Sequence, residues 1–544
     1  MITEVLVVGA GPVGLTLAID LGRRGVQCTL VEKKAAPEFL PKMERCNART
    51  MEMFRRMGLA DRIRAAGLDR NVPMDVYIAL AMNEPPLLRL PYPSVAEAEA
   101  EIAACQDGTM PREPYQLVSQ YTLEPLLKAE AERLPSVTVR YGYEFLCLSQ
   151  DADAATATLR GPDGRTSEIR AQYIVGCDGG SSAVRKQLGI QLRGEGNLLR
   201  LHQALYYAPD LFARIPIGDG PGRGRHYHIA DAQSTFLIMQ DSTKHWTLHA
   251  VVDNAHDMAA QFERAIGVPV PYEMLYVGEW KQNLLLADRY GDGRVFLAGD
   301  SIHLVIPTGG LGMNTGVGDA IDLSWKLHAT LRGWGGPDLL RSYEIERRQV
   351  GDRNVGASRY ASLGRRRWRG QYRPNIRDAT PDGQATRDNL ARVADVEQRK
   401  TNEMIGAELG YRYVGSPIVC EEPGGPEHLF REYVPTTWPG ARLPHVWLDD
   451  GRSVHDVIGD DGYTVLRLGR SQADTTPLEH ALRAFDAPCR VVTVDHDRVR
   501  DVYGYDLLLL RPDLHVAWRG NAPPGDPAQV ARIVTGHGKA GWVR

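Results

Sequence analysis

The chain has 544 residues, of which 64 are Lys or Arg and 68 are Asp or Glu, and 43% of its residues are hydrophobic. This composition is typical of a globular protein of about two to four domains, and it excludes a disordered or collagen-like chain. The net charge of -4 argues against nucleic acid as the main partner.

The apolar stretches are too short for a membrane span, so we expect no transmembrane helix and no membrane partner. The first residues lack the basic segment and cleavage site of a signal peptide. Seven widely spaced cysteines without a CxxC pair are typical of reduced thiols. We therefore expect a cytoplasmic protein without a metal site.

The N-terminal region carries a nucleotide-binding pattern. An apolar run over residues 4–8 predicts a buried strand, and Gly9, Gly11 and Gly14 follow it as GxGxxG before a helix. The first glycine permits a tight turn, the second lets the backbone approach a pyrophosphate, and the third allows close helix–strand contact. Glu32, at the end of the next strand, can accept hydrogen bonds from ribose hydroxyls and would repel a 2′-phosphate. FAD or NAD therefore fits this turn better than NADP.

The middle of the chain is rich in strand patterns. Residues 137–175 alternate like antiparallel strands, and the pattern resumes over 200–290. Alternation places His245, Thr247 and His249 on one face of a strand.

A second glycine-rich segment follows the strand predicted over residues 295–298. Asp300 lies where a carboxylate can bind ribityl or ribose hydroxyls, and Gly309, Gly310 and Gly312 leave room for a flat ring. The helix that starts near residue 312 would direct its positive N-terminus at an anion. A reduced flavin, which is negative near N1 and O2, would suit this position.

Long helices are predicted over residues 318–334 and 338–360, before a polar and basic stretch over 362–404. Arginines 365, 366, 367 and 369 could bind an anion there, although we favour a solvated helix face or linker. From about residue 439 the pattern of strand, helix, strand, helix and hairpin predicts a separate small α/β domain.

Together these motifs resemble the FAD-dependent aromatic hydroxylases, the class A flavoprotein monooxygenases of the para-hydroxybenzoate and phenol hydroxylase type. The resemblance rests on GxGxxG with Glu32, on Cys177-Asp178-Gly179, and on Gly299-Asp300 followed by residues 307–314. The closing segments 439–448 and 507–520 resemble the thioredoxin-like C-terminal domain of the larger members. Without a CxxC pair, that domain is not expected to exchange disulfides.

The resemblance implies an α/β fold with a Rossmann-like FAD-binding domain, an interleaved antiparallel-sheet substrate domain and a C-terminal thioredoxin-like α/β domain. The expected boundaries are 1–75, 112–190 and 285–360 for the FAD-binding domain, 76–111 and 191–284 for the substrate domain, 361–435 for a helical or linker region, and 436–544 for the thioredoxin-like domain.

The resemblance also implies roles for single residues. Arg45 resembles the family arginine near the FAD pyrophosphate, and Pro307 resembles the proline beside the flavin ring. On the predicted sheet, Tyr227, Met239 and Thr247 are candidates for substrate binding, and Pro307, Tyr227 and His228 are the candidate catalytic residues. The expected FAD-binding residues are Gly9, Gly11, Pro12, Val13, Gly14, Glu32, Lys33, Arg45, Gln120, Asp178, Gly299, Asp300, Pro307, Gly310, Gly312, Met313 and Asn314.

The implied reaction is the hydroxylation of a phenolic aromatic compound. NADH or NADPH, as a transient co-substrate, would reduce the flavin, and O₂ would add to give a flavin C4a-hydroperoxide that transfers oxygen to the ring. A homodimer is one candidate assembly. The sequence does not show whether the substrate is a simple or nitro-substituted phenol or a polyketide. It also does not show whether the co-substrate is NADH or NADPH.

Other functions stay open at this point. One is a different flavin enzyme on the same scaffold, such as a halogenase or a reductase, although the WxWxIP segment of the tryptophan-type halogenases is absent from the sequence. A second is a non-catalytic FAD-binding redox sensor. A third, an NAD-dependent dehydrogenase, leaves the glycines of residues 299–314 unexplained.

Overall fold

A largely parallel sheet forms the centre of the FAD-binding half of the protein. The computed structural model describes residues 1–42 and 44–538. The strand order is β18-β19-β10-β1-β2-β7, and only β18 runs antiparallel to its neighbour. Its central strands are short apolar runs because they are covered on both faces. The bounds are β1 (Ile2–Val8), β2 (Cys28–Glu32), β7 (Val137–Tyr141), β10 (Thr166–Gly176), β18 (Gly291–Asp292) and β19 (Val295–Leu297), with β8 (Glu144–Gln150) and β9 (Ala155–Arg160) as an antiparallel extension.

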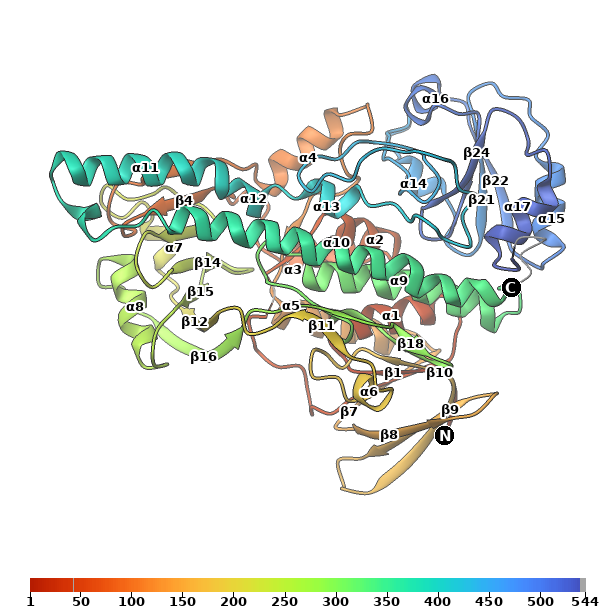
Figure 1. Cartoon of the computed structure of the whole chain (residues 1–544), viewed down its shortest axis with the longest axis horizontal. Helices are drawn as coiled ribbons and strands as arrows, with labels where there is room; N and C mark the ends of the chain where they lie inside the picture. Colours follow the sequence, from red (N-terminus) through yellow and green to blue (C-terminus); the bar gives the residue numbers. More distant parts are fainter. Residues whose placement is uncertain (43, 539–544) are drawn as a thin grey trace.

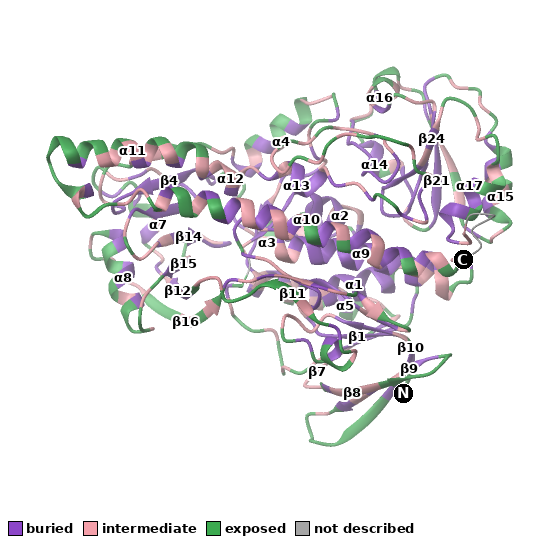
Figure 2. Ribbon diagram, in the orientation of Figure 1, coloured by how far each residue is buried: buried purple, intermediate pink, exposed green. Residues whose placement is uncertain are grey.

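Three helices pack together over this sheet. α1 (Pro12–Arg23) contacts both α5 (Gln120–Arg133) and α9 (Gly312–Leu331), and α9 in turn packs against α10 (Pro337–Arg369). α1 and α9 lie between the sheet and the C-terminal domain, and most of their residues are buried (Figures 1 and 2). The helices that start at Pro12 and Gly312 are therefore fixed against each other, and so are the glycine-rich turns before them.

A second, seven-stranded sheet lies beside the first, in the order β16-β12-β15-β14-β13-β4-β5. One face packs on α8 (Asp257–Ile266), where Tyr206 and Trp246 share a core with Phe262. A small sheet of β11 (Leu192–Glu195), β17 (Leu284–Ala287) and β20 (His303–Leu304) adjoins them. The large sheet consists of β4 (Val76–Ala79), β5 (Leu88–Leu90), β12 (Arg200–Tyr207), β13 (His226–Ile229), β14 (Phe236–Met239), β15 (His245–Ala250) and β16 (Glu273–Lys281).

The region after residue 360 is more regular than its sequence suggests. α10 does not end near residue 360 but continues to Arg369, so the basic stretch is the last part of a 33-residue helix. The helix crosses the molecule from the C-terminal domain to the seven-stranded sheet (Figure 1). Of the helices within the described residues, none combines the length and apolar character that a membrane crossing needs. α11 (Pro381–Glu397), α12 (Arg399–Asn402) and α13 (Ile405–Leu409) follow.

The C-terminal part forms its own four-stranded sheet in the order β22-β21-β23-β24. The predicted succession of strand, helix, strand, helix and hairpin is confirmed. The last six residues of the expected 436–544 domain lie outside the described residues. Its elements are β21 (Tyr463–Leu468), α15 (Thr476–Arg483), β22 (Cys489–Val494), α16 (Asp497–Tyr503), β23 (Leu507–Leu510), β24 (Val516–Gly520) and α17 (Pro527–Val534).

Shorter elements complete the chain. β3 (Arg45–Cys46) pairs with β6 (Gln116–Leu117) and carries the segment that reaches the second glycine-rich turn. The remaining helices are α2 (Ala48–Arg56), α3 (Ala60–Ala66), α4 (Val95–Ala104), α6 (Ala183–Gln187), α7 (Leu211–Arg214) and α14 (Val454–Val457).

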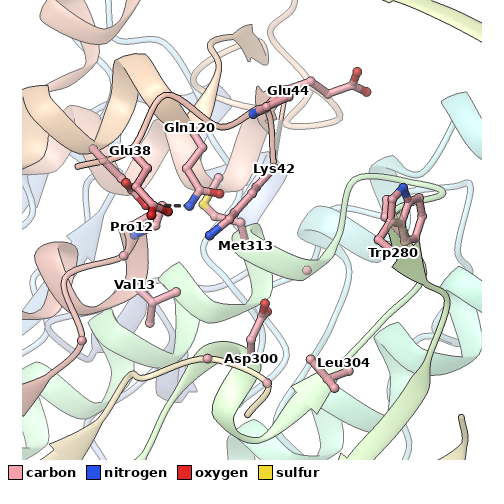
Figure 3. A pocket seen from close by; sticks show the side chains of 18 of the residues that line it. Pro12, Val13, Glu38, Lys42, Glu44, Gln120, Trp280, Asp300, Leu304 and Met313 are labelled. Carbon is pink, nitrogen blue, oxygen red and sulfur yellow. Dashed lines mark hydrogen bonds between the residues drawn. The ribbon is translucent and has the colours of Figure 1, made fainter. Parts of the chain in front are cut away.

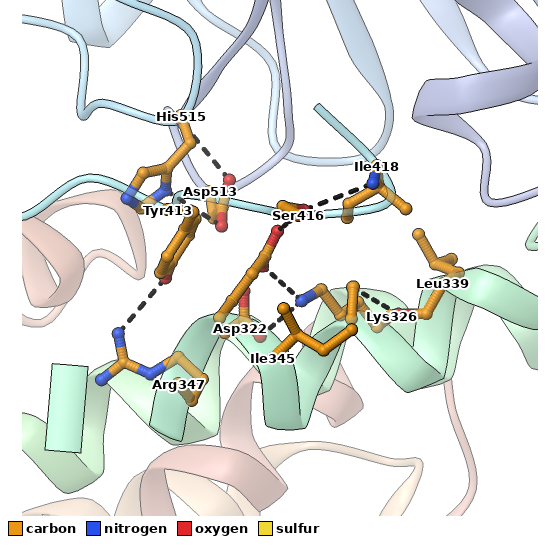
Figure 4. A network of polar contacts seen from close by, with 12 residues as sticks. Asp322, Lys326, Leu339, Ile345, Arg347, Tyr413, Ser416, Ile418, Asp513 and His515 are labelled. Carbon is orange, nitrogen blue, oxygen red and sulfur yellow. Dashed lines mark hydrogen bonds and ion pairs between the residues drawn. The ribbon is translucent and has the colours of Figure 1, made fainter. Parts of the chain in front are cut away.

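Five buried charged residues join the C-terminal domain to α9 and α10, and we call them the interdomain charge cluster: Asp322, Lys326, Glu346, Arg511 and Asp513. Lys326 Nζ lies 2.7 Å from Asp322 and 2.6 Å from Glu346. The guanidinium of Arg511 donates to Glu346, Asp322 and Asp513 over 2.6 to 2.9 Å. Every charge in the cluster therefore has an opposite charge within hydrogen-bond distance. Figure 4 shows Asp322, Lys326 and Asp513 from this cluster.

The polar contacts continue from this cluster toward the second glycine-rich turn. Arg347, next to Glu346, donates to Tyr413 Oη over 3.2 Å and to Asp319 over 2.8 Å. Asp319 lies 2.7 Å from His303 Nε2 and accepts a hydrogen bond from the Gly299 N–H. A continuous set of polar contacts thus links the C-terminal domain to the base of that turn.

Candidate functional site

A cavity of about 780 Å³ lies between the parallel sheet and the seven-stranded sheet. Both glycine-rich turns line it, one through residues 9–13 after β1 and the other through Asp300 and residues 307–314 after β19. Figure 3 shows Pro12 and Val13 of the first turn beside the same space as Asp300 and Met313 of the second. Two turns that are far apart in the sequence therefore form one site.

The first turn has the geometry that its glycines predict. Gly9 has a φ of +106°, and a Cβ atom there would lie 2.4 Å from the carbonyl oxygen of Cys177. Gly11 meets nothing closer than a Glu124 oxygen at 4.0 Å, so its backbone is open to the cavity. Glu32 accepts hydrogen bonds from the N–H groups of Ala10 and Lys34 at 2.9 and 3.0 Å, which holds its carboxylate at the turn.

The second turn is held by the segment around β3. Asn314 accepts a hydrogen bond from Asn47 N–H over 2.9 Å and donates to the Gly310 carbonyl over 2.6 Å. Arg45 donates to the Gly309 carbonyl over 2.8 Å and pairs with Glu408 at 3.3 Å. Arg45 therefore lies at the second turn, in the wall of the cavity that both turns share, and its contact with the FAD pyrophosphate stays a prediction.

Other expected cofactor residues line the same cavity. Lys33 and Gln120 are among its walls, and the Gln120 amide donates to Glu124 over 2.5 Å. Asp178 also lines it, while its carboxylate accepts hydrogen bonds from Ser182 Oγ and from the Ala183 N–H at the start of α6. Gly14 and Gly299 are not among the lining residues: they lie just behind the turns, where they allow close packing.

The far wall of the cavity is one face of the seven-stranded sheet. The expected alternation in β15 is confirmed, since Thr247 and His249 both line the cavity. Gln240 donates to Thr247 Oγ1 over 2.8 Å. The remaining sheet residues on this wall are Gln203, His226, Phe236, Ile238 and Trp280, with Arg225 just before β13.

Three expected sheet residues do not line the cavity. Tyr227 faces the opposite side, where its hydroxyl contacts the backbone of Gly222 and Gly224 and its ring stacks on Tyr77. Met239 is fully buried in that same core. His228 has the strand phase of His226, but its Nδ1 lies 3.3 Å from Arg369 and its ring packs on Trp368. Alternation gives the period of a strand but not which face is which, so it could not show that Tyr227 and Met239 face away from the cavity.

A polar group that the motifs do not identify lies in the same wall. Glu44 pairs with Arg225 over 2.7 Å, and its other oxygen lies 3.3 Å from His226 Nε2. Burial acts to raise the pKa of Glu44, but Arg225, His226 and Arg45 together outweigh it and hold this pKa well below its usual range. Burial, with Arg225 second, lowers the pKa of His226 to about 4. Burial also lowers the pKa of His249 to about 3, so both imidazoles are neutral at pH 7.

Several buried polar atoms in the cavity wall have no partner in the protein. Such atoms are uncommon in folded proteins and cost free energy unless a ligand or water satisfies them. Among the described residues they are Arg45 Nε, Tyr141 Oη, Arg225 Nε, His226 Nδ1, His249 Nδ1, Trp280 Nε1, Gln282 Oε1, Arg365 Nε and Thr401 Oγ1. The cavity is therefore suited to a large polar ligand beside an aromatic one.

The turns fit FAD in particular. The open backbone at Gly11 and the start of α1 suit a pyrophosphate, and the Glu32 carboxylate suits ribose hydroxyls. Asp300, Gly312 and Met313 lie together at the start of α9, where a flavin ring can meet a helix N-terminus. Within the described residues there is no group of three His, Cys, Asp or Glu side chains that could hold a metal ion.

Comparison with known proteins agrees with this geometry. Residues 2–358 match the family model of the FAD binding domain, and residues 436–536 match that of the aromatic-ring hydroxylase C-terminal domain. The chain belongs to the FAD-dependent aromatic-ring hydroxylases. Its cofactor is accordingly FAD, and its fold is the α/β fold expected from the sequence.

Individual relatives span nearly the whole hydroxylase chain. It is 31% identical to 4-methyl-5-nitrocatechol 5-monooxygenase of Burkholderia sp, with 97% of this chain and 96% of the relative covered. It is 32% identical to aklavinone 12-hydroxylase RdmE of Streptomyces purpurascens, with 97% of each covered. The rebeccamycin biosynthetic enzyme RebC with reduced flavin has a similar structure, with a TM-score of 0.89, 31% identity, and coverage of 98% and 99%.

Proposed function

We propose that this hydroxylase is an NAD(P)H-dependent monooxygenase that adds one oxygen atom to a phenolic aromatic ring. The observation that carries the proposal is the single cavity in which both glycine-rich turns face a wall of aromatic, histidine and amide side chains. Bound FAD would supply reducing equivalents taken from NADH or NADPH and would activate O₂. The protein must bind and orient the aromatic compound and exclude water.

The two turns would hold the cofactor in a fixed order. The first turn and Glu32 would bind the adenosine and pyrophosphate end. Asp300 and the residues from Pro307 to Asn314 would surround the flavin end, where the positive N-terminus of α9 stabilises negative charge on a reduced ring. Arg45 would act there by holding the Gly309 carbonyl.

His226 is the residue best placed to accept the phenolic proton. The ionised Glu44 carboxylate favours the tautomer in which His226 Nε2 carries the proton, because Nε2 lies 3.3 Å from it. Nδ1 then keeps its lone pair, and it has no partner in the protein. A phenol that loses its proton is a stronger nucleophile, so a neutral imidazole in the cavity wall favours its hydroxylation. This role replaces the one expected for Tyr227 and His228.

The wall favours an aromatic substrate. Phe236, Ile238 and Trp280 offer flat apolar surface, while Gln240 and Thr247 offer hydrogen bonds beside it. The nitrocatechol and aklavinone enzymes among the relatives bracket the size range to test, from one ring to a polycyclic system.

The test uses the FAD-loaded protein and a panel of mono- and polycyclic phenols with NADH and NADPH in turn. We expect one or more phenols to accelerate NAD(P)H oxidation and to yield a product heavier by one oxygen atom. A panel that stimulates only peroxide release would contradict hydroxylation of those phenols. Turnover that requires bromide or chloride would favour a halogenase, and tight FAD binding without turnover of any compound would favour a redox sensor.

A further inference from the structure

The arginines near the end of α10 have different environments in the structure. Arg367 is exposed and lies 3.5 Å from Glu397. Arg369 donates to the backbone carbonyls of Ile229 and Thr235. Arg365 instead lines the main cavity, so the basic stretch is not one solvated helix face.

Arg365 has no anionic partner within the part of the chain that the structure describes. Its Nε is buried without a hydrogen-bond partner, and its guanidinium lies 4.8 Å from the centre of the Phe236 ring. Burial lowers the pKa of Arg365 to about 10, which leaves it charged at pH 7. A half-buried cation that contacts an aromatic ring and no carboxylate is unfavourable on its own and gains most from a bound anion.

Arg365 lies where two cavities meet, and an anion could bind there. A second cavity of about 340 Å³ adjoins the first, and both are lined by Phe236, Gln282, Thr308 and Arg365. These four residues therefore form the junction between the space beside the glycine-rich turns and a side chamber.

The acidic groups nearest to Arg365 are already occupied. Glu44, whose charge also acts on Arg365, is held by Arg225 and His226. Asp231, in the wall of the side chamber, accepts hydrogen bonds from Thr235 and Gln261. The counter-charge for Arg365 must therefore come from a bound molecule.

We propose that Arg365 and the junction form a carboxylate subsite, and that the substrate is an aromatic acid whose ring lies in the main cavity. A planar guanidinium binds a carboxylate through two parallel N–H donors, and Gln282 and Thr308 lie at the same junction to add polar contacts. Asp231 in the chamber wall disfavours a doubly charged phosphate there. This inference rests on the proposed function, since it names the substrate class of the same cavity.

The test compares compounds that differ only by a carboxylate in place of a methyl group. Rhein and chrysophanol form a tricyclic pair, and meta-hydroxybenzoate and meta-cresol form a monocyclic pair. Each is titrated into the FAD-loaded protein, and Kd is measured from the change in flavin absorbance. In at least one pair the acid should bind about tenfold or more tightly than its methyl partner, as a charge-assisted pair predicts.

Variants assign that preference to Arg365. Arg365→Gln should weaken binding of the acid about tenfold and leave the methyl compound within about twofold, whereas Arg367→Gln removes the same charge from the exposed face and should change neither. Arg365→Met serves as a second variant if the first retains less FAD than wild type. Equal binding of acid and methyl partner in both pairs, no binding of either acid, or a preference that survives the loss of Arg365 would each overturn the subsite.

The binding experiment is independent of the proposed reaction. Absence of oxygen insertion into every phenol would overturn the hydroxylase while leaving an Arg365-dependent acid preference intact. Conversely, hydroxylation of methyl compounds without any acid preference would overturn the subsite alone.

Discussion

The interdomain charge cluster and the cavity wall are both rich in buried polar groups, but they differ in how those groups are satisfied. In the cluster, Arg511 and Lys326 contact carboxylates directly on several sides. In the cavity wall, His226, His249 and Arg365 each keep a buried nitrogen without a partner.

This difference indicates that the buried polar groups of the cluster stabilise the fold, whereas those of the cavity wall bind ligands. Paired charges need nothing further, so the cluster fixes how the C-terminal domain docks on α9 and α10. Unpaired polar atoms raise the free energy of the empty protein, and ligands recover that free energy on binding. Mutations in the two regions should therefore change different observables.

The largest expected effect is in the cluster. Arg511→Met leaves Glu346, Asp322 and Asp513 with one cation among them, and an uncompensated buried charge costs about 3–5 kcal/mol of unfolding free energy. Urea denaturation measures the loss. As a control, Arg490→Met removes an exposed pair with Asp461 on the same sheet and should change stability by less than about 1 kcal/mol. Equal stability of the two variants would contradict the view that the buried charges of the cluster stabilise the fold more than an exposed ion pair does.

The next effect is on turnover. His226→Gln removes the proposed proton acceptor and should lower kcat/KM for a phenol by about 100-fold, while FAD content stays at the wild-type level. Steady-state kinetics with the best phenol of the panel measures it. His245→Gln is the matched control, because His245 lies in the same sheet, on β15, but does not line the cavity. Unchanged kcat/KM in His226→Gln would exclude it as the base.

Cofactor retention should change by a smaller factor. Gly9→Ala forces an alanine to a φ of +106° with its Cβ against Cys177, and we expect FAD to bind about tenfold more weakly. Gly25→Ala also stands at a positive φ but has open space around it, so it should retain FAD. Equilibrium dialysis of the flavin distinguishes the two, and equal FAD affinity would show that the first turn does not need its glycine.

The smallest effect is on the pH dependence of stability. The pKa of His249 is about 3 in the folded protein and near its ordinary value when unfolded. The unfolded chain therefore binds the proton first as pH falls, and stability decreases. Between pH 7 and pH 6 this one histidine accounts for about 0.7 kcal/mol of lost unfolding free energy. His249→Gln should remove that part of the slope in thermal denaturation, whereas the exposed His256→Gln should not. An identical slope in His249→Gln would contradict the buried neutral state.

The sequence alone reveals those parts of the site that depend on backbone geometry. Gly9, Gly11, Asp300 and most of residues 307–314 belong to the turns themselves, and they line the cavity. The side chains of the sheet that line the cavity are harder to predict from the sequence. Alternation places His249 and Thr247 on the same face, but packing on α8 decides which face of the sheet is turned to the cavity. Tyr227 was misplaced for that reason.

Site residues that belong to no sequence motif could not be predicted from the sequence. Glu44 belongs to an irregular segment, and only the folded chain brings it to Arg225 and His226. Arg365 belongs to a run of arginines whose pattern predicts a solvated face, and only the structure shows that α10 continues past residue 360 and brings Arg365 to the cavity.

α10 has a consequence for building hybrid enzymes. Near its start it supplies Glu346 to the interdomain charge cluster, and near its end it supplies Arg365 to the cavity junction. A chimaera that borrows the C-terminal domain of another hydroxylase must therefore bring a cationic partner in the place of Arg511 that matches Glu346 and Asp322. Otherwise we expect a mismatch at the start of α10 to shift Arg365 at the cavity junction, because one continuous helix carries both Glu346 and Arg365.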